Sequence, residues 1–380
     1  MINFGLMNLK TANRYITPVL KKGQPDDNYK FLPLPKPTGR YPYHLSLQQI
    51  LPAVNGDEIV FHIAGDTGSI GSNRFQRQVV GAMAKQYQIG TQAGQPQFLY
   101  HLGDIVYNFG EAEQYARQFF EPFSHYPGPI LAIAGNHDSD VNPAAKIPYH
   151  SLDAFTAVFC DTLSRPVTFS RGAERKSMEQ PNVYWTLQTP MANIIGLYTN
   201  IPKYGVVTAG QRSWFVDELK AAAAERPNKA LILCLHHAPY SADTNHGSSL
   251  AMIELLEGVF SETGIKPDIV FSGHVHNYQR FSKHYPDGTT VPYIVAGAGG
   301  YDVLHTVAFT DDTLFTNEHP LLKRVTLEQY CDSAHGFLKI GIKKTGASLT
   351  LTGEYYTMQH EAETTTVHNA VLNDRFEINV

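Results

Sequence analysis

The sequence is poor in cysteine and in charge, and both shortages exclude classes of protein. Its 380 residues include three cysteines, Cys160, Cys234 and Cys331, which lie far apart and form no CxxC pair. This odd, scattered set argues against a disulfide framework, and Cys234 lies in an apolar run that suits a buried free thiol. Charged residues make up 17% of the chain and the formal net charge is −5, so no nucleic acid partner is expected.

Long hydrophobic runs and an export signal are also missing. No run approaches the ~18 apolar residues of a membrane span, so no membrane partner is expected. Residues 1–20, MINFGLMNLKTANRYITPVL, lack the charged segment followed by an apolar one that a secretory signal has. We therefore expect a soluble protein of a reducing compartment, cytoplasmic by default and secreted if the sequence is truncated. Nothing in the sequence indicates an oligomeric state.

What is present is a core-forming chain, 43% hydrophobic, with two alternating patterns. From about residue 55 to 295, short apolar runs alternate with longer segments whose apolar residues recur every three or four positions. This predicts strands and helices in turn, an α/β fold with right-handed crossovers. We divide the chain into an N-terminal extended arm (1–55), a main domain (56–345) and a β-rich C-terminal tail (346–380) packed on the same domain.

Five of the short apolar runs end at residues that can bind a metal ion. EIVFHIAG ends at Asp66, QFLYHLG at Asp104 with Tyr107 three residues on, PILAIAG at Asn136 and His137, LILCL at His236 and His237, and DIVFSG at His274 with His276 two residues on. In four of the five a glycine precedes the ligand, which lets the backbone turn sharply and an ion approach closely. Because sites in such sheets gather beyond the carboxyl ends of the strands, we expect these side chains to meet.

Each of these endings alone has a plainer interpretation. An aspartate after a strand often caps a turn, NHD can be a turn, HH can combine packing with one exposed ring, and alternate residues of an extended HxH point apart. Five such endings together are poorly explained by turns. Two aspartates, one asparagine, three histidines and one tyrosine offer mixed nitrogen and oxygen ligands, and this number suits two metal ions.

The order of these segments resembles a known family. GDTG, GDIVY, GNHD, a strand that ends in histidine, and GHVH follow one another as in the calcineurin-type metallophosphoesterases, and more narrowly in the purple acid phosphatases. The resemblance spans residues 60 to about 300. It implies that 56–345 is a metallophosphoesterase catalytic domain, with a β-sandwich core of two mixed sheets flanked by helices in four α/β/β/α layers.

One departure within the family points to the narrower group. Most metallophosphoesterases open with Asp-x-His, whose histidine binds metal, but the equivalent position here is Gly68. The resemblance implies that Tyr107, in GDIVY, supplies the missing ligand. A phenol has a pKa near ~10, so holding it as phenolate needs a strong Lewis acid. We therefore expect Fe(III) at the Tyr107 site and a divalent ion (Fe, Zn or Mn) at the other.

The resemblance also distributes the ligands between the two ions. The first ion takes Asp66, Tyr107, His276 and a shared Asp104, and the second takes Asp104, Asn136, His274 and one histidine of the HH pair. Counting back from Tyr240 and Ser241 gives His236, which we favour, whereas counting back two residues from Pro239 gives His237. Strand alternation lets only one of them face the metal.

Two further histidines are candidates for contact with a substrate. His137 directly follows Asn136, and His246 lies in the loop segment DTNHGSS. Either could bond a phosphoryl oxygen or protonate the leaving group. The segments Ser164–Pro181 and Tyr301–Cys331 are the expected pocket walls.

The resemblance implies a hydrolase whose partner is a small phosphate ester. It would hydrolyse phosphomonoesters by in-line attack of a metal-bound hydroxide. A phosphodiesterase or nucleotide-type phosphohydrolase could use the same metal centre, because pocket walls separate these substrates. A non-catalytic binding module on this scaffold is a further alternative, and such a module would be expected to lack some of the ligands.

Overall fold

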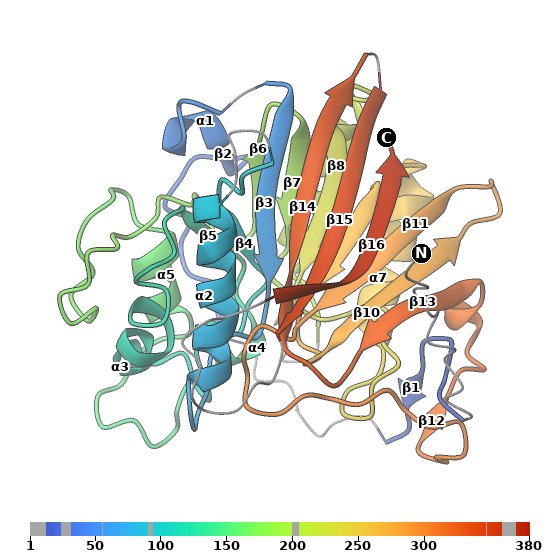
Figure 1. Cartoon of the computed structure of the whole chain (residues 1–380), viewed down its shortest axis with the longest axis horizontal. Coiled ribbons are helices and arrows are strands. Elements are labelled where there is room, and N and C mark those ends of the chain that lie inside the picture. The colour runs from blue at the N-terminus through green and yellow to red at the C-terminus, as the bar shows by residue number, and fades with distance from the viewer. Residues whose placement is uncertain are drawn as a thin grey trace, which may run out of the picture.

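Two mixed β-sheets form the centre of the molecule (Figure 1). The computed structural model describes residues 13–23, 32–54, 56–89, 94–199, 205–346, 348–358 and 370–380. The six-stranded sheet has the order β16 (Ala370–Asn379), β15 (Ser348–Met358), β14 (Gly336–Thr345), β3 (Glu58–Ala64), β4 (Leu99–His101), β5 (Ile130–Ala132). The eight-stranded sheet has the order β13 (Val325–Cys331), β10 (Tyr278–His284), β11 (Thr290–Ala296), β9 (Ile269–Ser272), β8 (Ala230–Leu235), β7 (Ala192–Gly196), β6 (Trp185–Gln188), β2 (His44–Ser46).

The strands that lead to the metal-ligand candidates run parallel within each sheet. β3, β4 and β5 are parallel neighbours, and so are β8 and β9. Parallel neighbours need a crossover, which helices supply. The helical segments between them include α2 (Arg74–Ile89), α3 (Ala112–Tyr115), the π-helical η1 (Ala116–Phe120) and α7 (Leu250–Thr263).

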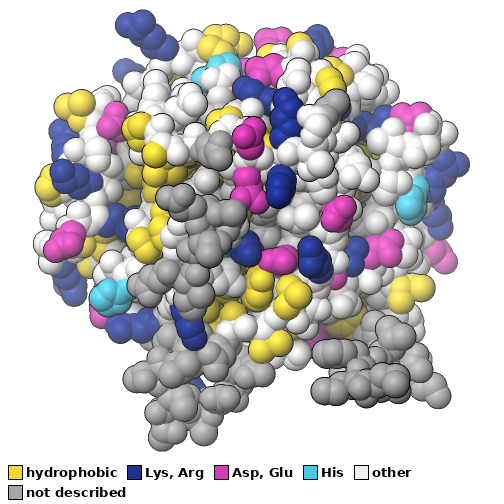
Figure 2. All heavy atoms as spheres, turned by 45° about the horizontal axis from the view of Figure 1, so that its top comes forward, with side chains coloured by type: hydrophobic (Ala, Val, Ile, Leu, Met, Phe, Trp, Pro, Cys, Tyr) yellow, Lys and Arg dark blue, Asp and Glu magenta, His cyan; other side chains and the backbone are white. Residues whose placement is uncertain are grey.

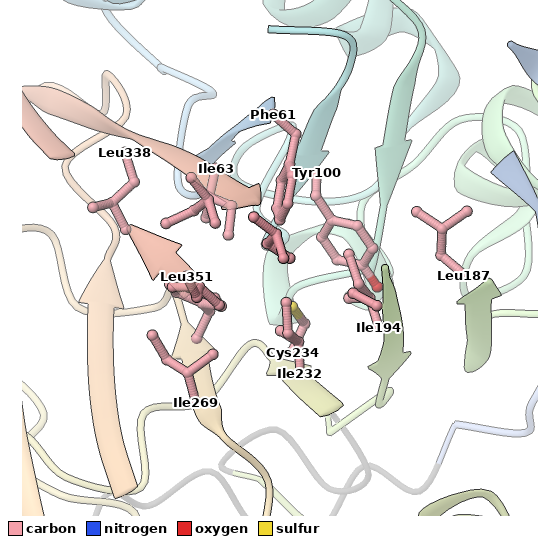
Figure 3. Packing of buried hydrophobic residues seen from close by; sticks show 14 of the residues in the cluster. Phe61, Ile63, Tyr100, Leu187, Ile194, Ile232, Cys234, Ile269, Leu338 and Leu351 are labelled. Carbon is pink, nitrogen blue, oxygen red and sulfur yellow. The ribbon is translucent and has the colours of Figure 1, made fainter. Parts of the chain in front are cut away.

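The inward faces of the two sheets pack on each other and make the main core. Alternate residues of a strand point to opposite faces. Figure 3 shows the inward set: Phe61, Ile63, Tyr100, Leu338 and Leu351 from the six-stranded sheet meet Leu187, Ile194, Ile232, Cys234 and Ile269 from the eight-stranded sheet. The predicted burial of Cys234 as a free thiol is confirmed.

Helices cover both outer faces of this sandwich. α2, η1 and α5 (Asp153–Phe159) pack on the outward residues of β3 to β5, for example through Met83 and Phe155. On the other side, α6 (Ala209–Ala223) and α7 cover the outward residues of β7, β8 and β9, among them Leu231 and Leu233. The expected four-layer arrangement, with two mixed sheets between helices, is therefore confirmed.

The described part of residues 1–55 adds small elements to this framework. β2 and the short α1 (Leu47–Ile50) lie at one edge of the eight-stranded sheet. β1 (Leu20–Lys21) pairs antiparallel with β12 (Phe315–Thr316), whose loop continues into the short 3-10 helix η2 (Pro320–Leu322). At the other end of the chain, β15 and β16 extend the six-stranded sheet, and Gly346 turns the β14–β15 hairpin with a φ of 64°.

The surface carries charges of both signs. Figure 2 shows Lys and Arg side chains interspersed with Asp and Glu over one face. Among the described residues, no helix is both long enough and apolar enough to cross a lipid bilayer.

Candidate metal centre

The seven predicted ligands project from strand ends of both sheets toward one place. Asp66 follows β3, Asp104 and Tyr107 follow β4, Asn136 begins the short α4 (Asn136–Ser139) after β5, His236 follows β8, and His274 and His276 follow β9. Asp66 and His236 are fully buried, and the others are buried or nearly so. The structure therefore brings all seven side chains together from positions spread over more than two hundred residues.

Three of the seven have a strained backbone. Asp66, Asp104 and His274 have φ values of 57°, 54° and 68°, in the left-handed region that residues with a side chain rarely adopt. Such a conformation costs about 1–3 kcal/mol and persists where surrounding bonds enforce it. Here the Asp66 N–H donates to Gly103 O at 2.9 Å, and the His274 N–H donates to Asp66 Oδ2 at 2.9 Å. Three of the eight described non-glycine residues with a positive φ are thus candidate ligands at strand ends.

Asp66, Tyr107 and His276 form one group of ligand atoms. Tyr107 Oη lies 3.3 Å from Asp66 Oδ1 and 3.1 Å from His276 Nε2. His276 Nε2 lies 3.7 Å from Asp66 Oδ1. Two atoms bound to one ion at ~2.0–2.2 Å each are separated by about this much. Burial raises the pKa of Tyr107 well above its usual value, so its phenolate requires a cation beside it.

Asn136, His236 and His274 form the second group. Asn136 Oδ1 lies 3.0 Å from His236 Nε2 and 2.9 Å from His274 Nδ1. Asp104 Oδ2 lies 3.4 Å from His236 Nε2, and, after burial, the charge of Asp104 is the next largest cause of the raised pKa of Tyr107 in the first group. Asp104, His236 and His274 offer ligand atoms that all lie within 4.8 Å of one another. Asp104 therefore stands between the two groups, where a carboxylate could touch two ions.

The two histidines of the HH pair point in different directions, as expected for neighbouring residues at the end of strand β8. Ile232 and Cys234 face the other sheet, and continuing this alternation points His236 to the same side. His237 turns its Nδ1 to Thr199 Oγ1 at 2.9 Å, and its ring centre lies 4.4 Å from that of His274. The geometry therefore places His236, and not His237, beside Asp104 and Asn136.

The orientation of two imidazole rings fits a cation. His236 donates its Nδ1–H to Leu102 O at 2.8 Å, and His276 donates its Nδ1–H to Val303 O at 3.1 Å. Each neutral ring then turns the lone pair of Nε2 into the site. The Nε2 lone pair of His236 faces the carbonyl oxygen of Asn136, which is also an acceptor. Two facing acceptors are stabilised by a positive charge between them, so this donor set suits a metal ion.

Burial alone would lower the pKa of His236, but the Asp104 carboxylate raises it to about 9. In the absence of a metal ion, a proton on His236 supplies the positive charge that the two acceptors need.

Gly68 leaves room for Tyr107. A β carbon at this position would lie 2.8 Å from Tyr107 Cδ2 and 2.6 Å from Ile105 O, closer than real contacts allow. A histidine at residue 68 and the observed Tyr107 cannot occupy this space together. The sequence suggested that Tyr107 replaces a histidine missing at position 68, and this steric conflict explains why the two would not occur together.

The two candidate substrate histidines flank the centre on different sides. His137 lies beside the first group, with its ring centre 4.3 Å from that of Tyr107, and its N–H donates to Asp104 Oδ1 at 2.9 Å. His246 lies beside the second group, with its ring centre 4.0 Å from that of His274. Burial lowers the pKa of His246 to about 4.

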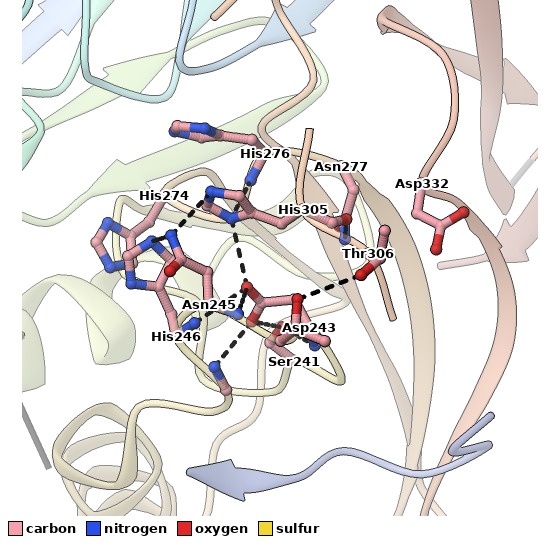
Figure 4. A network of polar contacts seen from close by, with 12 residues as sticks. Ser241, Asp243, Asn245, His246, His274, His276, Asn277, His305, Thr306 and Asp332 are labelled. Carbon is pink, nitrogen blue, oxygen red and sulfur yellow. Dashed lines mark hydrogen bonds and ion pairs between the residues drawn. The ribbon is translucent and has the colours of Figure 1, made fainter. Parts of the chain in front are cut away.

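Sequence reasoning missed a polar network behind His246 and His276, shown in Figure 4. The buried Asp243 carboxylate accepts the N–H groups of Asn245 and His246 at 2.9 and 3.0 Å, and lies 3.3 Å from His305 Nδ1. The His305 ring stacks on His276 at 4.2 Å between ring centres. The position of Asp243 three residues before His246 could have revealed an Asx turn. His305 lies in an irregular loop and gave no periodic signal.

A second missed residue, Gln118 of η1, holds the Tyr107 segment. Its Oε1 accepts the N–H groups of Ser69 and Tyr107, both at 2.9 Å, and its Nε2 donates to Tyr107 O at 2.5 Å. Asp138 acts similarly on the neighbouring turn, accepting the Ile105 N–H at 2.9 Å. π-helical turns such as η1 often occur at functional sites.

One of the two expected pocket walls lies at the centre. Tyr301 has its ring centre 4.4 Å from those of Tyr107 and His276. By contrast, Ser164, Ser177, Met178 and Pro181 line a different cavity of about 680 Å³, together with residues 38–50. That cavity includes none of the seven ligand candidates.

Comparison with known proteins gives a family and a set of relatives. The family model of the calcineurin-like phosphoesterases matches residues 59–278, more than half of the chain. The chain is 25% identical over 259 residues to purple acid phosphatase 18 of Arabidopsis thaliana, covering 64% of this chain and 50% of that protein. It is 28% identical over 165 residues to probable purple acid phosphatase 20 of the same plant, covering 42% and 34%. The chain thus spans half or less of the length of these relatives.

A solved structure shares the fold. It is described as "GAP50 the anchor in the inner membrane complex of Plasmodium" and superposes with a TM-score of 0.50 at 13% identity, covering 79% of this chain and 85% of that one. At this identity the likeness concerns the fold alone.

Proposed function

The chain belongs to the calcineurin-like phosphoesterase family, and on this premise we propose that it is a phosphatase that hydrolyses small phosphomonoesters at a two-metal centre. The observation that carries the proposal is the convergence of Asp66, Tyr107 and His276 beside Asn136, His236 and His274, with Asp104 between them. The purple acid phosphatase relatives support phosphomonoesters as the substrate class.

We assign one ion to Asp66, Tyr107, His276 and Asp104, and the other to Asp104, Asn136, His236 and His274. Fe(III) suits the first position because burial opposes ionisation of Tyr107, and only a strong Lewis acid overcomes this. A divalent Fe, Zn or Mn ion suits the second, where Asn136 contributes a neutral oxygen. When bound, the two ions would neutralise charge on the phosphoryl oxygens and activate water.

The chain's own groups orient the reactants and move protons. The carbonyls of Leu102 and Val303 fix the tautomers of His236 and His276. His137 donates its Nδ1–H to Asn108 O at 2.7 Å, so its Nε2 is the nitrogen that can meet a phosphoryl oxygen. His246, on the opposite side, can donate a hydrogen bond to the leaving oxygen. Because burial lowers its pKa to about 4, it protonates that oxygen only in acid, a role worth typically ~10²–10⁴-fold.

The metal assignment is tested by elemental analysis with a visible spectrum. We expect a tyrosinate-to-iron absorption band that Tyr107→Phe abolishes. Tyr301→Phe is the matched control, because its ring lies beside Tyr107 and His276 without belonging to either ligand group. A colourless protein that holds two zinc or manganese ions would contradict the Fe(III) assignment.

The activity is tested with p-nitrophenyl phosphate. Asp104→Asn should lower kcat by several orders of magnitude, because it removes the carboxylate shared by both groups. Asp217→Asn is the control, because Asp217 is a surface aspartate near Tyr41. Equal turnover by the wild type and Asp104→Asn would overturn the proposal.

Two alternatives are outcomes of the same experiments. Faster hydrolysis of bis(p-nitrophenyl) phosphate than of the monoester would identify a phosphodiesterase. A chain that binds no metal would be a binding module, and the fold does not exclude this, since one protein of this fold is described as an anchor. The retention of all seven ligand side chains supports an enzyme.

A further inference from the structure

A cavity of about 440 Å³ adjoins the metal centre on the side of the second ligand group. His274 and His246 line it from the side of the centre, and Lys21 and Gly23 from the N-terminal arm. The start of α7, from Ser249 to Ala251, completes the lining together with Glu254. Since His246 is the proposed donor to the leaving oxygen, a leaving group would extend into this cavity.

The arm is fixed against the loop that carries His246. Val19 donates its N–H to Ser241 O and accepts the N–H of Ser248, both at 2.8 Å. The Lys22 N–H donates to Leu314 O at 2.7 Å on the other side. The strand that holds Lys21 is therefore bonded on both edges, and this fixes the backbone from which the Lys21 side chain projects.

Strand alternation directs two neighbouring lysines differently. The Lys21 ammonium donates to Asn245 O at 2.8 Å, inside the cavity lining. The Lys22 ammonium donates to Thr313 O at 2.9 Å, and Lys22 is exposed. An ammonium has three N–H donors, so the bond to Asn245 leaves Lys21 two for a ligand.

Few charged side chains line the cavity. Among the described residues that line it, Lys21 is the one lysine or arginine and Glu254 the one carboxylate. Glu254 is exposed, one turn into α7. The N-terminus of this 14-residue helix contributes a partial positive charge to the same wall. A negatively charged group beside Lys21 would therefore be stabilised.

We propose that this cavity is the leaving-group pocket and that Lys21 selects phosphate monoesters whose leaving group carries a second anion, a carboxylate or a further phosphate. This inference rests on the proposed phosphatase activity and names its substrate class. Lys21 acts by binding the second anion of the leaving group. Removing Lys21 should therefore lower kcat/KM only for substrates that carry such an anion.

Three substrates test the proposal: phenyl phosphate, 4-carboxyphenyl phosphate and 1,4-phenylene bisphosphate, each followed by release of inorganic phosphate. Lys21→Met should lower kcat/KM for the two anionic substrates, relative to phenyl phosphate, by about tenfold, as expected for one charge-assisted hydrogen bond. A loss confined to one of the two identifies the preferred anion. Lys22→Met is the matched control and should leave the ratio of kcat/KM for each anionic substrate to kcat/KM for phenyl phosphate unchanged. Glu254→Gln should raise this ratio.

Partial unfolding of a variant would lower kcat/KM for all three substrates by the same factor. It would therefore leave the ratios between substrates unchanged and would not be mistaken for a change in selectivity. An equal effect of Lys21→Met on all three substrates, or unchanged ratios, would overturn the proposal while leaving the phosphatase intact. A wild-type protein that releases phosphate from none of the three would overturn the phosphatase, and the selectivity with it.

Discussion

At the scale of single residues, Gly68 decides which ligand set the centre can have. Its α carbon lies so close to Ile105 O, Gln118 and the Tyr107 ring that even a methyl group would overlap them. A glycine at position 68 is thus compatible with the observed position of Tyr107, whereas a residue with a side chain is not.

Gly68→Ala should therefore disturb the Tyr107 site. We expect a loss of stability of about 1–3 kcal/mol from overpacking, together with a weakened tyrosinate band. Urea unfolding and the visible spectrum measure the two effects. Gly258→Ala is the control, because nothing lies within 4 Å of its would-be β carbon in α7, and it should stabilise the protein by about 0.5–1 kcal/mol. Similar behaviour of both variants would refute the steric argument.

A buried histidine far from substrate sets a pH limit on stability. Burial lowers the pKa of His62 to about 3, and its Nδ1 lies 3.1 Å from Tyr126 Oη. The unfolded chain binds a proton at this residue below pH ~6.5, whereas the folded chain does not until pH falls near the lowered pKa. His62 should therefore destabilise the fold by about 1.4 kcal/mol per pH unit as pH falls through this window.

His62→Gln removes the titration and keeps a hydrogen-bonding side chain. The free energy of unfolding, measured by denaturant titration between pH 7 and 4, should fall less steeply in this variant than in the wild type. His150→Gln, which changes an exposed histidine, should keep the wild-type slope. Parallel slopes for all three proteins would show that His62 is not the group responsible.

At the scale of elements, η1 supports the ligand loop rather than the core alone. Gln118→Met removes the acceptor of the Ser69 and Tyr107 N–H groups and the donor to Tyr107 O. Leaving such buried groups unpaired should cost about 2–4 kcal/mol and lower kcat/KM, because Tyr107 is less well held. Gln114→Met, one turn earlier and half-buried, removes only the 3.1 Å bond from Gln118 Nε2 to Gln114 Oε1 and should have a much smaller effect on both quantities. Equal turnover numbers for the two variants would show that Gln118 does not support the function of Tyr107.

The strand ends were predictable from sequence because two apolar patterns mark the elements. Short continuous apolar runs mark strands, and apolar residues every three or four positions mark helices. Apolar runs marked β3, β4, β5, β8 and β9, and the residue after each run carried the chemistry. The choice between His236 and His237 also follows from alternation, since His236 continues the inward face of Ile232 and Cys234.

Other parts of the site could not be predicted, for a physical reason. Gln118 and His305 act through hydrogen bonds and ring stacking with residues distant in sequence. Neither interaction leaves a local pattern. The segment 164–181 was expected at the pocket but lines another cavity, and its sequence carries no motif that specifies where the loop folds back.

At the scale of the whole molecule, a polar contact connects the two sheets near the C-terminus. Asp374 of β16 accepts Arg280 Nε of β10 and the Tyr278 hydroxyl, both at 2.7 Å. Asp374→Asn should lower the free energy of unfolding by about 1–3 kcal/mol, because Arg280 is only partly hydrated and loses its counter-charge. Asp287→Asn, which affects an exposed pair with Lys266, should change the unfolding midpoint little. A midpoint for Asp374→Asn equal to that of the wild type would show that the contact adds no stability.

The hydrogen bonds of the arm also order events during synthesis. Tyr15 and Lys22 donate to Ala308 and Leu314, and Ile16 accepts from Leu327, so the arm leaves the ribosome long before these partners exist. At ~5–20 residues per second the interval is on the order of tens of seconds. The candidate ligands end at His276 and the partners Ser241 and Ser248 precede it, so a nascent chain that already has all seven candidates can bond the arm along one edge only. The second edge of the arm, which bonds Ala308, Leu314 and Leu327, is therefore completed only after the candidate ligand set has been synthesised.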